Sequence, residues 1–292
     1  MNRKLKTDYI FDTINYLFMF ILILVTLYPL LHVFLGSISD PYRLQKHRGI
    51  LLYPLGFDLE SYARVFANKS IVTGFRNSVF ITITGVLLSM IMTILAAFFL
   101  SRRDILLKKH VMWFIVLTMY FSGGLIPSYM NIKELGLYNS IWVLIIPGAL
   151  STWNVILMRT YFLGLPNELE EAATIDGASE YYTLTRIIIP LSKPIIAVLV
   201  LYYGVDKWNE WFAASIYLRD RKMYPIQLIL REILINNDPE KMMEDVMLTD
   251  KSAYRETIKY ATTMAVTLPI LFVYPFLQKY FVKGVLLGSL KG

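Results

Sequence analysis

The stretch NSVFITITGVLLSMIMTILAAFFLS (77–101) contains no Asp, Glu, Lys or Arg, and Arg76 and Arg102 flank it. It is longer than the roughly 20 mostly apolar residues that a helix needs to cross a bilayer. Lipid offers the backbone no hydrogen-bonding partners, so a spanning segment must satisfy its own peptide groups, and a helix does this. The stretch therefore predicts a membrane-spanning helix near 78–100.

Similar uncharged gaps recur along the chain and predict further spanning helices. They lie between Asp12 and Asp40, Lys109 and Lys133, Glu134 and Arg159, and Lys259 and Lys279. They give spans near 13–35, 111–131, 140–162 and 260–278. A sixth span, near 194–217, begins apolar but then carries Asp206, Lys207 and Glu210. Prolines in or near the ends of these spans are expected to be kinks that packed neighbours tolerate.

The composition agrees with an all-α membrane protein of six transmembrane helices. Of 292 residues, 56% are hydrophobic and 17% are charged, against about 45–50% and about 25% in ordinary globular domains. There is no Cys, and the three His lack ligand spacing, so we expect neither disulfides nor a metal site. We attribute the net charge of +7 to Lys and Arg at membrane edges rather than to nucleic-acid binding. The expected location is the cell membrane, crossed several times and in contact with lipid.

Charge in the connections predicts the orientation. Four Lys/Arg lie at 102–109, three at the N-terminus and three from 279 onward. The positive-inside rule puts these segments, and hence both termini, in the cytoplasm. The loops 36–77 and 218–259 are then extracytoplasmic. Within them, 58–66 predicts a helix with Asp58 as N-cap, and 224–234 predicts an amphipathic helix opened by Pro225. These helices either cap the bundle or form a docking surface for an external partner.

The loop GLPNELEEAATIDGASEYYTLTRIIIPLSKP (164–194) predicts two short cytoplasmic helices that meet at a glycine. Asn167 is a candidate N-cap, with Glu170 completing a capping box. Gly177 ends the first helix, Ser179 caps the second, and Pro190 stops it. The result is a projecting knob anchored to a span at each end. Such a knob either transmits a push from a cytoplasmic partner or is simply a capped hairpin.

The stretch EAATIDGASEYYTLTRIIIP (171–190) resembles the EAA motif of ATP-binding-cassette importer permeases. Six of the matching positions are expected to couple the chain to an ATPase: Glu171, Ala172, Ala173, Asp176, Gly177 and Ala178. Leu184 stands where an aromatic residue is usual. In such permeases the motif forms coupling helices that dock into clefts of the ATPase subunits.

The resemblance covers nearly the whole chain. The segments 121–148, 208–234 and 274–292 are similar to the carbohydrate-uptake branch, which includes the smaller permease of the maltose system. Permeases for oligosaccharides released from complex polysaccharides such as pectin look closer still. The resemblance implies a type I importer fold, with 1–292 as one transmembrane permease domain and 164–194 as its coupling loop.

The resemblance also implies partners. These are a second homologous permease, two ATPase subunits and an extracellular sugar-binding protein that delivers an oligosaccharide. No cofactor is expected on this chain, because ATP and Mg²⁺ belong to the ATPase. The sequence accordingly contains no GxxxxGK[ST] phosphate-binding pattern.

The predicted span near 194–217, which is the fifth in chain order, carries the polar groups that could contact a substrate. Asp206, Trp208, Asn209 and Glu210 are candidates for the substrate pathway, with Asn154 as a weaker one. Sugars bind to aromatic faces and to amide or carboxylate groups, and ionisable residues inside a membrane commonly face a water-filled path. The alternative is that these residues lie at the outer interface, where Trp and Tyr collect.

Three other functions compete with sugar import. The chain could be an importer permease for another solute class, because the motif at 171–190 does not name the solute. It could be an intramembrane enzyme with Asp206 and Glu210 as an acid/base pair, although no nucleophile accompanies them and no catalytic residue is assigned. It could also be a structural anchor, which would not need the two capped helices.

Overall fold

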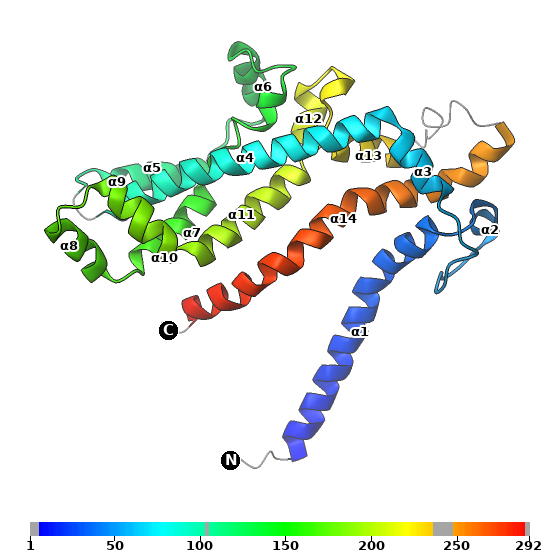
Figure 1. The fold of residues 1–292 in the computed structure, drawn as a ribbon, viewed down its shortest axis with the longest axis horizontal. Helices are drawn as coiled ribbons and strands as arrows, with labels where there is room; N and C mark the ends of the chain where they lie inside the picture. Colours follow the sequence, from blue (N-terminus) through cyan, green and yellow to red (C-terminus); the bar gives the residue numbers. More distant parts are fainter. Residues whose placement is uncertain (1–5, 103–104, 236–247, 290–292) are drawn as a thin grey trace. The chain divides into compact units, whose positions relative to one another are not determined.

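The computed structural model describes residues 6–102, 105–235 and 248–289, and every regular element in these ranges is helical (Figure 1). The first elements are α1 (Lys6–Ser37), α2 (Pro41–Lys46), α3 (Glu60–Ala67) and α4 (Lys69–Ser101). The next are α5 (Lys108–Tyr120), α6 (Leu125–Glu134), the 3₁₀ helix η1 (Ile141–Leu144) and α7 (Thr152–Leu163). Then follow α8 (Asn167–Ile175), α9 (Glu180–Tyr182), the π-helix η2 (Thr183–Ile188), α10 (Ile189–Leu191) and α11 (Lys193–Trp208). The last are α12 (Phe212–Tyr217), the 3₁₀ helix η3 (Arg221–Met223), α13 (Ile226–Ile235) and α14 (Leu248–Ser289).

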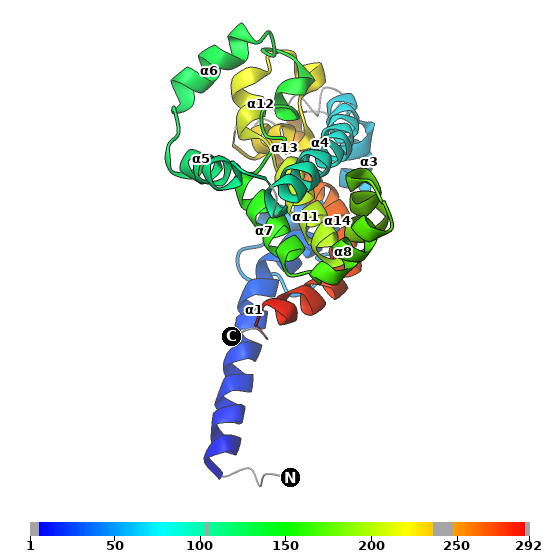
Figure 2. The ribbon, with the colours of Figure 1, turned by 90° about the vertical axis from the view of Figure 1, so that its left-hand side faces the viewer.

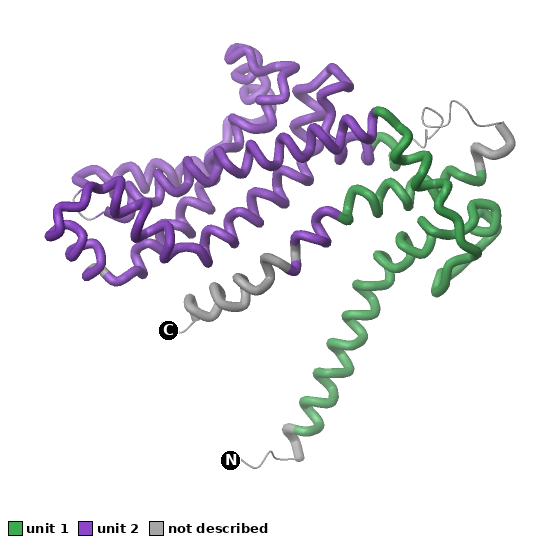
Figure 3. The backbone as a smooth tube through the Cα atoms, viewed as in Figure 1, with its two compact units in different colours: residues 1–69, 232–268 green, residues 70–231, 269–292 purple. Residues whose placement is uncertain are grey.

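The chain forms two compact units, residues 1–69 with 232–268 and residues 70–231 with 269–292 (Figure 3). In the first unit, α1 packs on the beginning of α14. The His32 ring meets the Tyr260 ring edge-on at 5.7 Å between centroids. A Cβ on Gly36 would lie 2.6 Å from Cδ2 of Tyr260, so only glycine allows this approach.

The second unit is organised around α4. Near its middle, Ile81 packs with residues of α6, η1, α12 and α13. Towards its C-terminal end, Met90 and Ala97 pack with residues of α7, η2 and α11. Small residues of α4 permit this close packing, as is common between helices in membranes. A Cβ on Gly74, for example, would lie 3.2 Å from Cα of Ile226.

Among the residues that the structure describes, two helices are long and apolar enough to cross a membrane, Tyr9–Ser37 and Lys69–Ser101, as predicted for the spans 13–35 and 78–100. The predicted span 260–278 lies inside α14, which contains Pro269 and Pro275 without interruption. Two bent helix pairs, 108–134 and 180–208, bring the number of candidate crossings in the described residues to four at most.

The prediction of one continuous helix over 111–131 is wrong. The helices α5 and α6 are bent by 116° relative to each other, and Figure 2 shows them diverging at their connection. The break falls at Phe121–Gly124, where Gly124 has a φ of 86° that L-residues in a helix cannot adopt. Pro127, expected to cause a kink, instead sits in the first turn of α6, where proline is tolerated.

The predicted spans 140–162 and 194–217 are also interrupted. The first divides into η1 and α7 on either side of Pro147 and Gly148, and Ser151 caps α7 by accepting a hydrogen bond from the Asn154 N–H. The second divides into α11 and α12 at 209–211. Non-helical backbone at membrane depth is tolerated where protein buries it or where it lines a cavity. Both breaks are therefore expected to be buried by protein or to line a cavity.

The helices predicted in the two long loops are present. The helix α3 begins at Glu60, whose N–H donates to Oδ1 of Asp58 at 2.7 Å, although the N-cap position is Leu59. The helix α13 begins at Ile226, directly after Pro225. Some residues used to predict the orientation lie outside the described residues: Arg3, Lys4, Arg103 and Lys291. The loop portion 236–247 lies outside them as well.

Candidate functional site

The junction between α8 and α9 is built largely from backbone hydrogen bonds. The Ala178 N–H donates to Ala173 O at 2.9 Å, and the Gly177 N–H donates to Thr174 O at 3.1 Å. This pair of bonds is the Schellman motif, which requires a left-handed residue after the helix. Gly177 supplies it with a φ of 74°. The prediction that Gly177 ends the first helix is therefore confirmed.

The start of α8 differs from the prediction. Asn167 is the first residue of the helix rather than its N-cap, and Pro166 occupies the cap position without a side-chain hydrogen bond. The predicted capping box is therefore wrong. Glu168 and Glu170 still lie in the first turn, where the helix dipole favours negative charge.

The second helix begins where predicted and ends later. Ser179 caps α9 by accepting a hydrogen bond from the Tyr182 N–H at 3.3 Å. Pro190 does not stop it, because η2 widens the preceding turn into a π-helix, with the Ile189 N–H donating to Leu184 O. The wider turn accommodates a proline that would clash in a regular α-helix. The helical run continues to Leu191, and α11 follows at an angle of 82°.

The six motif residues divide by exposure. Glu171, Ala172, Asp176 and Gly177 are exposed, Ala178 is half-buried, and Ala173 is buried. No heavy atom lies within 4 Å of a Cβ placed on Gly177. The conformation, not the space, therefore demands glycine there, and most of the motif faces outward.

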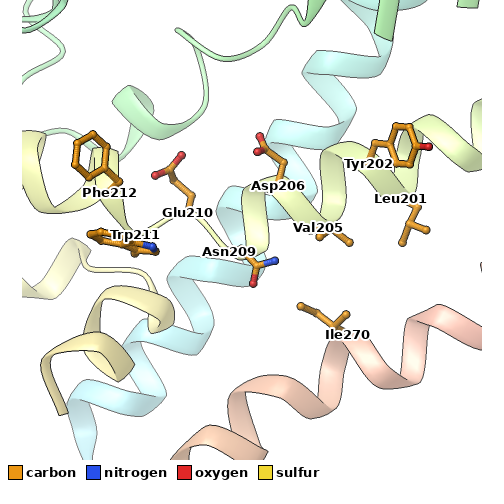
Figure 4. Close-up of a pocket in the computed structure, with 9 residues that line it drawn as sticks. All are labelled: Leu201, Tyr202, Val205, Asp206, Asn209, Glu210, Trp211, Phe212 and Ile270. Carbon is orange, nitrogen blue, oxygen red and sulfur yellow. The ribbon is translucent and has the colours of Figure 1, made fainter. Parts of the chain in front are cut away.

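A cavity of about 570 Å³ lies where α11 ends and α12 begins (Figure 4). Three of the five residues predicted for the substrate pathway line it: Asp206, Asn209 and Glu210. Aromatic and aliphatic side chains complete the wall: Leu201, Tyr202, Val205, Trp211, Phe212 and Ile270. Trp211 is held by the guanidinium of Arg231, whose Cζ lies 4.2 Å from the ring centroid.

Two of these three predicted residues make structural hydrogen bonds through their side chains. Oε1 of Glu210 accepts from the Ala213 N–H at 2.9 Å, which satisfies a donor at the start of α12. Oδ1 of Asn209 accepts from Nε2 of Gln227 in α13 at 3.2 Å. These contacts fix the break between α11 and α12. Asp206 is exposed and has no hydrogen bond or ion pair to any described residue.

Lys207 points into the protein, unlike its neighbour Asp206. It is 6% exposed, and its Nζ donates to Leu144 O at 2.8 Å. That carbonyl ends η1, so the ammonium group satisfies backbone freed by the break in the predicted span 140–162. Gly85 and Gly148 make room for it. A Cβ on Gly85 would lie 3.2 Å from Cδ of Lys207, and one on Gly148 would lie 3.0 Å from Nζ.

The other two predicted pathway residues lie elsewhere. Trp208 is 7% exposed, and its ring lies 6.2 Å from that of Phe75. It lines an adjoining, apolar cavity of about 420 Å³ between α4, α11 and the 269–273 part of α14, which shares Leu201, Val205 and Ile270 with the first cavity. Asn154 is buried in α7. The structure therefore does not bring Trp208 or Asn154 to the cavity at Asp206.

A family model described as the inner membrane component of binding-protein-dependent transport systems matches residues 86–287. The match includes α8, α9 and the cavity after α11. The chain belongs to this family. It is a membrane transport subunit rather than an enzyme, and it resides in the cell membrane, as the apolar helices indicate.

Two relatives from Bacillus subtilis strain 168 are similar to the permease over nearly its full length. One is the polygalacturonan/rhamnogalacturonan transport system permease protein YtcP, 38% identical, covering 97% of this chain and 99% of the relative. The other is the protein LplC, 38% identical, covering 98% and 97%. Among solved structures, a bacterial ABC transporter involved in the import of the acidic polysaccharide alginate matches with a TM-score of 0.87. It is 31% identical and covers 96% of this permease and 100% of that chain.

The permease contains polar contacts that the sequence patterns did not single out. The hydroxyl groups of Tyr203 in α11 and Thr93 in α4 lie 2.7 Å apart, and the Tyr203 hydroxyl also accepts from the Ser151 N–H at 3.2 Å. Tyr203 thereby connects α4, α11 and the start of α7. A tyrosine in an apolar run gives no periodic signal of such a contact. In the described ranges no three His, Asp or Glu side chains come together as a metal site would need.

Proposed function

We propose that this chain is one of two related permease subunits in an ATP-driven, binding-protein-dependent importer of oligosaccharides. The observation that carries the proposal is the knob formed by α8 and α9. It is held by its own backbone, leaves Glu171, Ala172, Asp176 and Gly177 exposed, and connects to α7 and α11. A rigid element of this kind is suited to receive force from a docked subunit.

The proposed topology has six crossings and both termini in the cytoplasm. The four candidate crossings account for α1, α4, the α5–α6 pair and the bent run 180–208, of which α11 would be the part that crosses. The broken segment from η1 to α7 and the part of α14 near 260–278 would supply the remaining two. This topology puts α8 and α9 on the cytoplasmic side, together with the basic residues of 102–109.

The proposed partners are a second permease, two ATPase subunits and an extracellular sugar-binding protein. ATP and Mg²⁺ would bind to the ATPase subunits. Closure of the ATPases on ATP would move the knobs of the two permeases together and open the pathway outward. ATP and the substrate-loaded binding protein would each act through a difference in affinity for the two states, as any ligand that shifts such an equilibrium must.

The proposed substrate class is an oligosaccharide. The cavity at the end of α11 presents the Trp211 ring beside the free carboxylate of Asp206, a pairing of apolar face and hydrogen-bond acceptor that suits sugar rings. The names of the relatives add support, because YtcP transports polygalacturonan and rhamnogalacturonan, and the structural neighbour imports alginate. An importer for a different solute class is the remaining alternative.

Uptake by cells that carry or lack the gene for this chain tests the proposal. Labelled oligosaccharides of galacturonate, mannuronate and neutral hexoses would be offered separately, with a labelled amino acid as the comparison. The proposal expects ATP-dependent uptake of at least one oligosaccharide to require this chain. Loss of amino-acid uptake alone would overturn the substrate class, and uptake that survives depletion of ATP would overturn the energy source.

A further inference from the structure

Arg102, directly after the last residue of α4, joins α4 to both helices of the knob. Its guanidinium group forms ion pairs with Glu170 of α8 and Glu180 of α9. The Arg102 Nε donates to Oε2 of Glu180 at 2.8 Å. One side chain therefore contacts both helices on either side of the Gly177 turn.

The surroundings hold Arg102 in place. Its side chain is 16% exposed, and its Cζ lies 4.5 Å from the centroid of the Phe98 ring, one turn earlier in α4. Nζ of Lys108 donates to the Arg102 carbonyl at 2.5 Å. An arginine suits this position because its planar fork can address two carboxylates at once, whereas a lysine is a point charge on a flexible stem.

The energy of these ion pairs is modest. Glu180 is 71% exposed, so solvent screens its pair strongly, and exposed ion pairs contribute little to stability. Loss of Arg102 should therefore leave the protein folded. The knob would stay attached to α7 through residues 164–166 and to α11 beyond Leu191. It would lose its ion pairs to the end of α4, and its remaining contact with α4 would be the packing of η2, which continues from α9.

The helix α4 leads from Arg102 to the substrate side of the same unit. In its C-terminal half it packs on α7, η2 and α11, and Thr93 meets Tyr203 of α11. Nε of Arg159 in α7 donates to Leu100 O at 3.0 Å, close to Arg102. Further along, Gly85 of α4 packs on the stem of Lys207 at the end of α11. A displacement of α4 thus reaches both broken segments.

We propose that Arg102 is a positioning residue for transport, which makes the knob and α4 move as one body. Displacement of the knob by a docked ATPase then moves α4 directly, in addition to α7 and α11. This inference rests on the proposed function, because it takes the knob to be the ATPase-docking element. It assigns to Arg102 the transmission of that movement, a role distinct from docking itself.

The structural test measures one distance in the permease. The chain has no Cys, so cysteines introduced at Phe99 in α4 and Ile175 in α8, which are 45% and 85% exposed, would be the only spin-labelling sites on this chain. In the purified complex in lipid nanodiscs, the doubly labelled protein that retains Arg102 should show a narrow distribution of distances between the two labels. Arg102→Ala should broaden it, and Arg102→Lys should broaden it less. An equally narrow distribution in Arg102→Ala would overturn the proposal.

The functional test uses unlabelled protein and measures sugar transported per ATP hydrolysed. Arg102→Ala should lower this ratio about fivefold or more, which is the low end of typical coupling between linked sites, while ATPase subunits still co-purify. Arg76→Ala is the matched control, because Arg76 is an exposed arginine at the other end of α4. An unchanged ratio in Arg102→Ala would overturn the inference. Failure of any ATPase to bind the unsubstituted chain would instead overturn the proposed function, and the distance measurement would still test whether Arg102 holds the knob to α4.

Discussion

The permease contains two junctions between helices that differ in how they are stabilised. Between α8 and α9, the turn is closed mainly by backbone hydrogen bonds around Gly177. Between α11 and α12, the side chains of Asn209 and Glu210 hold the turn, and Lys207 supports the neighbouring break after η1. The first junction leaves exposed side chains such as Glu171 and Asp176 available to a partner. The second uses most of its polar side chains to maintain the fold.

The two junctions therefore differ in which side chains are expected to serve transport and which are expected to maintain the fold. At α8–α9, a substitution of an exposed side chain should affect coupling without affecting folding. At α11–α12, substitution of Glu210 or Lys207 should affect folding first, and Asp206 is the polar side chain that remains for a substrate. Substitutions of Glu171 and Gly177 in the first junction, and of Lys207, Glu210 and Asp206 in the second, test this division.

Glu171→Lys and Gly177→Asp should each abolish ATP-dependent uptake. Both put a new charge on the exposed surface of the knob, and the second also strains a residue with a φ of 74°. Gly136→Asp is the matched control for strain, because Gly136 has a φ of 70° and also has no atom within 4 Å of an added Cβ. Uptake should survive in Gly136→Asp. Normal uptake in Gly177→Asp would show that the knob does not couple transport.

Lys207→Met should destabilise the permease by about 1–3 kcal/mol, because the buried Leu144 carbonyl loses its donor. Methionine retains most of the stem volume, so the change isolates the ammonium group. Thermal unfolding in detergent would measure the effect. Lys133→Met, at an exposed lysine of α6, should leave the unfolding temperature unchanged. Equal stability of the two variants would show that Lys207 is not needed at the break.

Glu210→Ala and Asp206→Asn should affect different properties. Glu210→Ala removes a hydrogen bond at the start of α12 and should cost about 1 kcal/mol, as losses of helix caps do. Asp206→Asn changes an exposed residue and should keep stability within about 0.5 kcal/mol, but it should raise the substrate concentration for half-maximal uptake. An unchanged uptake curve in Asp206→Asn would remove the cavity from the substrate pathway.

The smallest effect concerns Glu60 in the loop 36–77. The Tyr254 hydroxyl donates to its Oε2 at 2.6 Å, and this bond, followed by the pairing with Arg64, lowers the pKa of Glu60 below its ordinary value of 4.5. A lowered folded-state pKa stabilises the fold above pH 4.5, and the contribution is lost as pH falls through the lowered value. Because the side chain is half-exposed, screening keeps the contribution below about 1 kcal/mol.

The measurement compares unfolding temperatures of the unsubstituted chain and Glu60→Gln from pH 7 to pH 3. The difference should be present at neutral pH and should shrink below pH 4.5. Glu134→Gln, at an exposed carboxylate of α6, should show no such pH-dependent difference. A difference that grows on acidification would contradict the assignment.

Those parts of the fold that depend on local patterns could be predicted from the sequence. Uncharged gaps identified α1, α4 and the core of α14, and the glycine and serine at 177 and 179 identified the turn between α8 and α9. The breaks within the other predicted spans were missed, because apolar length says nothing of continuity. Gly123 and Gly124 together were the available signal for one of them.

The direction of side chains could not be predicted in the same way. On a continuous helix, Lys207 and Glu210 would share a face, but α11 ends between them, and the two side chains satisfy different backbone groups. Trp208 and Asn209 are adjacent in sequence but line different cavities, because α11 ends at Trp208. Arg102 contributed only a positive charge to the sequence argument, because its partners lie 68 and 78 residues away.

We propose that the α8–α9 knob receives the ATPase subunits. Affinity purification of the tagged chain from mild-detergent membranes, with partners identified by mass spectrometry, tests this docking. The unsubstituted chain and Gly136→Asp should recover a second permease and an ATPase. Gly177→Asp should recover the second permease and lose the ATPase. Equal recovery of the ATPase by Gly177→Asp and the unsubstituted chain would contradict the claim.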